Sequence, residues 1–149
     1  MKLVTVDQMR ALERQADERG VSYATLMESA GVAVARSVRR WLGGAAGRNV
    51  AVLVGPGNNG GDGLVAARQL HDWGAVVSVA LPMARSGPDE NFDAVARRGI
   101  AVLEAETPGF VLRLQECLRG CDAVVDALLG TGHSRPLSEI GRASCRERV

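Results

Sequence analysis

The sequence predicts an α/β fold built on a mostly parallel sheet. Three observations support this prediction. Apolar, β-branched runs alternate with amphipathic segments in the order β-α-β-α-β-α-β after residue 48. The first run, residues 50–54, shows no polar alternation, which is typical of a strand buried on both faces of a parallel sheet. A length of 149 residues with 46% apolar residues suits one globular domain.

Two helices are expected before the first strand. The pattern T-V-D-Q that begins at Thr5 has the form of a capping box and predicts a helix over residues 6–19, with Leu12 and Ala16 on its inner face. A second helix is expected over residues 23–42, where an apolar residue recurs at every fourth position. These apolar residues are Leu26, Ala30, Val34, Val38 and Leu42. Small residues at 29–31, 33 and 35 would allow close packing against a sheet or a second subunit.

The rest of the chain completes the alternation. The later strands are expected at residues 76–81, 100–103 and 123–127. The helices between the strands are expected at residues 62–73, 89–98 and 109–119. Alternation of this kind favours right-handed crossovers that cover both faces of the sheet.

The sequence GPGNNGGDG, residues 55–63 (the first loop), ends the first strand and opens the next helix. Glycines at Gly55, Gly57, Gly60 and Gly61 permit positive φ and let backbone N–H groups approach a ligand. The positive end of the following helix dipole would attract a phosphate or another anion there. A tight β–α turn without a ligand is the simpler alternative, but the content of glycine and asparagine exceeds what such a turn needs.

The same loop satisfies the dinucleotide-binding pattern G-x-G-x-x-G. In dehydrogenases an acidic residue at the end of the next strand binds the adenosine ribose. Here that strand is followed by Pro82, Met83 and Ala84, and Asp72 lies in the helix before it. A nicotinamide-dependent dehydrogenase is therefore disfavoured.

A second loop, residues 126–136, follows the fourth strand with the sequence DALLGTGHSRP. Ligands of open α/β sheets bind at the carboxyl ends of strands where the strand order reverses. If the first and fourth strands are neighbours, both loops border one crevice and Asp126 presents a carboxylate to it. A cap on a neighbouring helix is the alternative role for Asp126.

Composition argues against several classes of protein. A formal charge of +1 predicts no attraction to nucleic acid or to anionic membranes. A mean hydropathy of +0.02 and the lack of a spanning apolar run argue against a membrane protein, and the first residues do not form a signal peptide, so a cytoplasmic location is expected. Cys117, Cys121 and Cys145 form no C-x-x-C pair, which favours free thiols over a zinc or disulfide framework.

Three motifs together resemble the YjeF N-terminal family, the NAD(P)H-hydrate epimerases. They are LMESAG at residues 26–31, GNNGGDG at 57–63 and DALLGTG at 126–132, and the resemblance covers residues 1–138. It implies a Rossmann-like three-layer α/β/α sandwich, a homodimer, and an enzyme that interconverts the R and S forms of hydrated NADH or NADPH (NAD(P)HX). A separate or fused dehydratase would then repair the S form. A non-catalytic nucleotide-binding or scaffold module of the same fold is the alternative, and retention of the asparagine and aspartate residues argues against it.

The resemblance also implies site residues. Contacts to the hydrated dinucleotide are expected from Asn58, Asn59, Gly60, Gly61, Asp62, Gly130, Thr131, Gly132, His133, Ser134, Arg135 and Pro136. Asn59 and Asp126 would supply oxygen ligands to K⁺, in keeping with the preference of hard cations for oxygen. The carboxylate of Asp62 is the candidate acid/base group for loss and return of the substrate hydroxyl, although it could instead cap its helix or hold the substrate.

The end of the chain departs from the family. The family continues with further β–α units, including a D-I-P-S-G type motif that nothing after Ser138 resembles. Residues 139–149, EIGRASCRERV, instead resemble an in-frame translation of a sequencing adapter, against the alternative of a natural arginine-rich helix start. We expect a C-terminally truncated domain at residues 1–138 and a non-native tail at 139–149. An unpaired strand edge and uncovered apolar faces would leave such a chain poorly stable and inactive.

Overall fold

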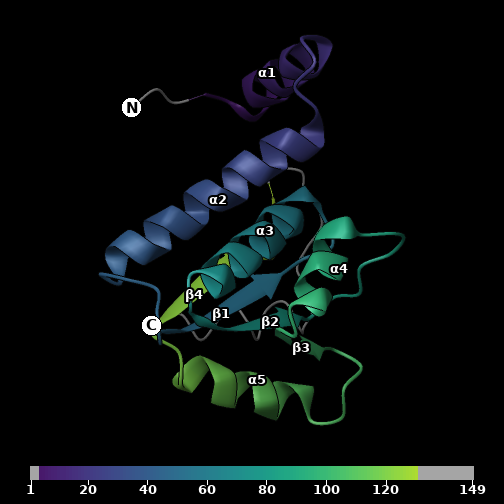
Figure 1. The fold of residues 1–149 in the computed structure, drawn as a ribbon. Coiled ribbons are helices and arrows are strands. Elements are labelled where there is room, and N and C mark those ends of the chain that lie inside the picture. The colour runs from purple at the N-terminus through teal and green to yellow at the C-terminus, as the bar shows by residue number, and fades with distance from the viewer. Residues whose placement is uncertain (1–3, 131–149) are drawn as a thin grey trace.

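The computed structural model describes residues 4–130, which form a four-stranded parallel sheet and five helices (Figure 1). The strands are β1 (Asn49–Val54), β2 (Val76–Leu81), β3 (Ala101–Glu104) and β4 (Ala123–Ala127). The helices are α1 (Val6–Glu18), α2 (Tyr23–Trp41), α3 (Asn58–Asp72), α4 (Glu90–Arg97) and α5 (Phe110–Arg119). The predicted α/β class is confirmed, and most predicted bounds agree within one or two residues.

The strand order is β3-β2-β1-β4, so β1 and β4 are neighbours. This is the arrangement that was needed for the two loops to border one crevice. They pair in parallel register, with Leu53 opposite Asp126 and Val54 opposite Ala127. The chain runs outward from β1 to β2 and β3 and then returns to the other side of β1. The strand order therefore reverses beside β1, and the two loops that follow β1 and β4 emerge at the same edge of the sheet.

Helices cover both faces of the sheet, as expected of a three-layer sandwich. In Figure 1, α2, α3 and α4 lie on one side of the sheet and α5 lies on the other. Val50, Val52 and Val54 of β1 belong to the core beneath α3, while Leu53 packs with Phe110 and Leu114 of α5. Alternate residues of β1 thus enter two different cores. This is why the strand reads as a continuous apolar run.

Helix α2 presents the predicted face only in part: Leu26, Val38 and Leu42 are half-buried, and Val38 and Leu42 pack against the core. Gly31 and Ala35 are buried and Val38 is half-buried, whereas Ala30 and Val34 are exposed. A repeat of four residues drifts by about 40° per step around a helix of 3.6 residues per turn, so it cannot stay on one face. Gly31 lies directly against Val65 and the backbone oxygen of Asp62, which leaves no room for a side chain and seats α2 on α3.

Helix α1 begins as predicted but packs differently. Thr5 Oγ1 accepts a hydrogen bond from Gln8 N at 3.2 Å, and Gln8 Oε1 accepts one from Thr5 N at 2.8 Å, which confirms the capping box. The predicted inner face is wrong at Leu12, which is 50% exposed, whereas Ala16 is half-buried; α1 contains no fully buried residue. Figure 1 shows α1 set apart at one end of the molecule. Within residues 4–130 no helix has the length and apolarity required to cross a membrane.

Candidate active site

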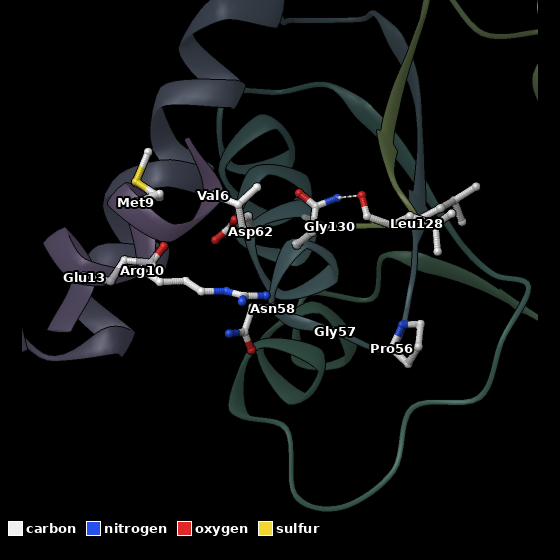
Figure 2. A pocket seen from close by; sticks show the side chains of 12 residues that line it. Val6, Met9, Arg10, Glu13, Pro56, Gly57, Asn58, Asp62, Leu128 and Gly130 are labelled. Atoms are coloured by element: carbon white, nitrogen blue, oxygen red, sulfur yellow. Dashed lines mark hydrogen bonds between the residues drawn. The ribbon is translucent and has the colours of Figure 1, made fainter. Parts of the chain in front are cut away.

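A cleft of about 810 Å³ opens at the carboxyl ends of β1 and β4 (Figure 2). Three segments form its walls: one face of α1, the first loop with the start of α3, and the beginning of the second loop. The residues that line it are Val6, Met9, Arg10, Glu13, Pro56, Gly57, Asn58, Asn59, Asp62, Leu128, Leu129 and Gly130. The structure therefore brings both loops to one crevice, as expected from the strand order.

The first loop does not have the predicted conformation. Helix α3 begins at Asn58 rather than Asp62, so Gly60 and Gly61 lie in its first turn. None of Gly55, Gly57, Gly60 and Gly61 has positive φ. The N-cap residue Gly57 has no side chain, and the first-turn N–H groups of α3 receive no side-chain cap. The helix therefore directs towards the cleft its positive dipole end and first-turn N–H groups that receive no side-chain cap from residues 4–130.

Close packing explains these glycines instead. A Cβ at Gly61 would lie 2.5 Å from the sulfur of Met27, and one at Gly63 would lie 2.5 Å from Cβ of Ala127. Gly55 lies directly against the backbone oxygen of Leu128 in the same way. These contacts draw α3 onto α2, β4 and the second loop. The missing side chains thus set the width of the site rather than the shape of a turn.

Two of the predicted site residues hold the start of the second loop. Asn59 Nδ2 donates a hydrogen bond to the carbonyl oxygen of Leu129 at 3.2 Å, which Figure 2 shows as a dashed line. Asp126 Oδ1 accepts a hydrogen bond from the backbone N–H of Leu128 at 3.1 Å. Asn59 lines the cleft, whereas Asp126 is not among the lining residues found in the described part of the chain. Both side chains nevertheless converge on residues 128–129.

Asp62 lies one turn into α3 with its carboxylate in the cleft, opposite α1 (Figure 2). Burial, together with the nearby carboxylate of Glu13, raises the pKa of Asp62 from 3.8 to about 6. A carboxyl with this pKa is partly protonated near neutral pH and can both donate and accept a proton. This is the behaviour required of a general acid/base.

Sequence reasoning missed the contribution of α1. Val6, Met9, Arg10 and Glu13 line the cleft from this helix. Their spacing of three and four residues places them on one helical face, and this signal is visible in the sequence. Nothing in the sequence indicates that this face lies opposite α3, because α1 makes few contacts with the rest of the molecule.

Arg85, which follows β2, was also missed. Its Nη1 donates hydrogen bonds to the carbonyl oxygens of Gly55 and Gly57, the latter at 3.3 Å. Its Nε and Nη2 contact Asp89 Oδ2 at 2.7 Å and 2.6 Å. The only signal in the sequence is that Arg85 stands a few residues beyond a strand end, where α/β proteins place ligand-binding groups.

Part of the predicted site lies outside the described residues. This applies to Thr131, Gly132, His133, Ser134, Arg135 and Pro136, and to the tail at residues 139–149. Their roles stay predictions. Among residues 4–130, no group of three or more histidine, cysteine, aspartate or glutamate side chains is arranged to hold a metal ion.

Comparison of the sequence with known proteins identifies one family. A sequence profile of the family described as YjeF-related protein N-terminus matches residues 23–145. The bifunctional NAD(P)H-hydrate repair enzyme Nnr of Thermofilum pendens is 45% identical over 95% of this chain and 28% of its own length. The NAD(P)H-hydrate epimerase of Aspergillus fumigatus is 36% identical over 93% of this chain and 57% of its own length. The corresponding enzyme of Rhodobacter capsulatus is 39% identical over 94% and 67%.

Among solved structures, the crystal structure of the yeast protein ynu0 superposes with a TM-score of 0.73 and 28% sequence identity. The match covers 98% of this chain and 64% of the yeast chain. The chain therefore spans about two thirds or less of the length of these relatives.

Proposed function

This chain belongs to the YjeF-related N-terminal family, and on that basis we propose that its cleft interconverts the R and S forms of hydrated NADH or NADPH. One observation carries the proposal. The first loop and the start of the second loop border one cleft, and burial together with the nearby Glu13 raises the pKa of the carboxyl group inside it, Asp62, to about 6. Relatives named NAD(P)H-hydrate epimerase or repair enzyme support the same reaction.

The chemistry requires one proton to move twice. The reacting carbon of the hydrated nicotinamide carries a hydroxyl and is bonded to the ring nitrogen. A protonated Asp62 donates its proton to that hydroxyl, the C–O bond breaks and water leaves, while the nitrogen lone pair stabilises the cation. Water then adds to the opposite face and returns a proton to the Asp62 carboxylate. A pKa of about 6 suits both half-reactions, because both protonation states are populated near neutral pH.

The start of α3 provides the complementary binding site for the anionic part of the substrate. The N–H groups of Asn58 and Asn59 belong to its first turn, both residues line the cleft, and the N-cap Gly57 has no side chain to cover them. The diphosphate of a dinucleotide bound at this end would gain from both the free donors and the helix dipole. Asn59 holds the second loop at a fixed distance from this turn through its bond to Leu129.

We also propose that Asn59 and Asp126 hold a potassium ion. The donors fit this ion, because they are an amide oxygen, a carboxylate and nearby loop carbonyl groups rather than sulfur or imidazole. The bond from Asn59 Nδ2 to Leu129 fixes the amide and leaves its oxygen for a ligand, and both side chains converge on residues 128–129. The ion would supply positive charge that steadies the second loop against the substrate.

The homologous proteins also suggest partners. We propose that the intact enzyme is a homodimer, since Met9 and Leu12 of α1 leave large apolar surface exposed. The relative from Thermofilum pendens is named a bifunctional repair enzyme, which supports a dehydratase acting in the same pathway, fused or separate. Sedimentation of the wild type and of Leu12→Glu tests the dimer; equal, monomeric behaviour of both argues against it.

An epimer interconversion assay tests the proposed reaction. The intact enzyme, with the β–α units that the family resemblance places after residue 138, is added to one resolved epimer of hydrated NADPH, and NMR or chromatography follows formation of the other. Asp62→Asn is expected to lower turnover by roughly a hundredfold or more with little change in substrate affinity. Asp72→Asn, on the far end of the same helix and paired with Arg98, serves as the control that keeps its activity. Nucleotide binding without interconversion would favour the non-catalytic alternative, and unchanged turnover in Asp62→Asn would remove that residue from the mechanism.

A further inference from the structure

Arg85 lies between the first loop and the start of α4 and contacts both. Its guanidinium donates to the carbonyl oxygens of Gly55 and Gly57 on one side and binds the Asp89 carboxylate on the other. Asp89 in turn caps α4, since its Oδ1 accepts hydrogen bonds from Asn91 N at 3.1 Å and Phe92 N at 3.0 Å. One ion pair therefore ties the turn at residues 55–57 to the start of a helix that packs on α3.

The turn depends on this side chain for its polar contacts. Pro56 has no N–H group, so the turn offers few internal donors for its own carbonyl oxygens. Arginine supplies several donors in one plane, and a single guanidinium reaches both Gly55 and Gly57 while it keeps its bond to Asp89. The pair is largely withdrawn from water, with Arg85 16% and Asp89 18% exposed, so its hydrogen bonds are strong and their loss leaves buried groups unpaired.

The space around Gly60 shows how closely the guanidinium of Arg85 packs against the first loop. A side chain at this position would clash with both Nη1 of Arg85 and the carbonyl oxygen of Gly55. The first turn of α3 therefore packs directly on Arg85. The position of the guanidinium sets the position of the N–H groups that face the cleft.

We propose that Arg85, held by Asp89, is a positioning residue for substrate binding. It draws the carbonyl oxygens of Gly55 and Gly57 to the back of the loop and thereby presents the N–H groups of residues 58 and 59 to the nucleotide. The identity of the ligand as a hydrated nicotinamide nucleotide rests on the proposed function; the control of loop geometry does not. Arg85 is not among the residues found to line the cleft in the described part of the chain, and four of its five N–H groups already contact Asp89 or the carbonyl oxygens of Gly55 and Gly57.

Three variants test this role. Arg85→Ala removes the guanidinium. Asp89→Asn keeps an oxygen for the cap of α4 but removes the charge that orients Arg85, and it provides a milder variant if Arg85→Ala folds poorly. Arg98→Ala is the matched control, because Arg98 forms a comparable pair with Asp72, through Nε at 2.9 Å and Nη2 at 3.0 Å, and does not contact the first loop.

The first readout is kinetic. Arg85→Ala is expected to raise KM by about tenfold or more with a smaller fall in kcat, Asp89→Asn to raise KM less, and Arg98→Ala to leave KM within about twofold. Millimolar guanidinium is expected to restore much of the affinity of Arg85→Ala and of no other variant. If Arg85→Ala matches Arg98→Ala, or if guanidinium does not lower its KM, the proposal is overturned.

The second readout does not depend on catalysis. In ¹H–¹⁵N spectra, the amide signals of Asn58, Asn59 and Gly60 are expected to shift in Arg85→Ala and to return towards their original positions with guanidinium. Arg98→Ala should leave them in place. An intact enzyme without epimerase activity would refute the proposed function alone, whereas unmoved amide signals in Arg85→Ala would refute the role of Arg85 alone.

Discussion

Replacing Asp62 by asparagine is expected to stabilise the fold at neutral pH, apart from its effect on turnover. Burial and the charge of Glu13 raise the pKa of Asp62 from 3.8 to about 6. A carboxyl group with a higher pKa in the folded state binds its proton more tightly there than in the unfolded chain. The folded protein therefore has this stabilisation in full below pH 3.8, loses it as the pH rises to about 6, and does not regain it at higher pH.

The size of the pKa shift of Asp62 sets how much the free energy of unfolding changes with pH. The difference between 3.8 and about 6 corresponds to roughly 3 kcal/mol without screening. Asp62 is only half-buried, so water screens its charge and we reduce the expected cost to about 1–2 kcal/mol. Asparagine has nearly the same shape and carries no charge, so it avoids this cost. In a chain of 149 residues, a gain of 1 kcal/mol raises Tm by about 2–4 °C.

Thermal unfolding of the wild type and of Asp62→Asn at several pH values measures this difference. The gain in Tm for Asp62→Asn should be largest above about pH 7 and should shrink towards about pH 3. Asp72→Asn should behave in the opposite way, because the hydrogen bond from Arg98 lowers the pKa of Asp72 and stabilises the fold once that group is charged. A lower Tm for Asp62→Asn at neutral pH, or a gain that does not change with pH, would contradict the reasoning.

Three further outcomes are expected. Gly63→Ala should lower the free energy of unfolding by about 1–3 kcal/mol in urea titrations, because its Cβ would lie 2.5 Å from that of Ala127. Gly57→Ala is the control, because its Cβ would meet nothing within 4 Å. Equal losses of stability in the two variants would contradict the packing argument. Asn59→Ala should weaken substrate binding by about tenfold in calorimetric titrations, since the second loop loses its bond to Asn59; unchanged affinity would show that the bond is dispensable. Replacing K⁺ by tetramethylammonium should lower turnover of the wild type, measured by the same epimer assay, and full activity without K⁺ would remove the ion from the proposal.

The order and type of the elements could be predicted from local patterns. Strand β1 is an unbroken apolar run and β4 a short one between polar residues, so each was placed within a residue of its bounds. The N-terminus of α1 followed from a capping box, which is a contact between residues three apart. Such features depend on near neighbours in the chain, and sequence shows near neighbours directly.

The predictions that failed concerned which faces of α1 and α2 pack against the rest of the molecule. The face of α2 was assigned by a four-residue repeat, which was wrong at Ala30 and Val34, because these are exposed and the structure buries Gly31 and Ala35. The apolar Leu12 of α1 was expected inside and is half exposed. The hydrophobicity of a side chain shows that burial would stabilise it, but not which surface it will pack against. At Gly31 the absence of a side chain allows α2 to pack on α3, and no apolar residue marks this contact in the sequence.

The candidate site shows the same division. The positions of the two loops were predicted from the glycine-rich motif and the strand ends, and the family resemblance pointed to Asn59 and Asp62, which line the cleft. Arg85 was not predicted, because its partners are the carbonyl oxygens of residues that lie 28 and 30 positions earlier in the chain. Its importance arises from donors and acceptors of the backbone, which every residue carries and no motif records.

The sequence by itself determined the alternation of strands and helices, the position of the glycine-rich loop and the presence of a carboxylate within it, because each depends on residue type and spacing along one stretch of chain. Only the tertiary structure decided that β4 lies beside β1, that Glu13 of α1 faces Asp62, and that Arg85 stands behind the loop. The protonation state of Asp62 follows from these placements. A pKa is set by the water and the charges around a group, and it is the folded chain that brings those charges together.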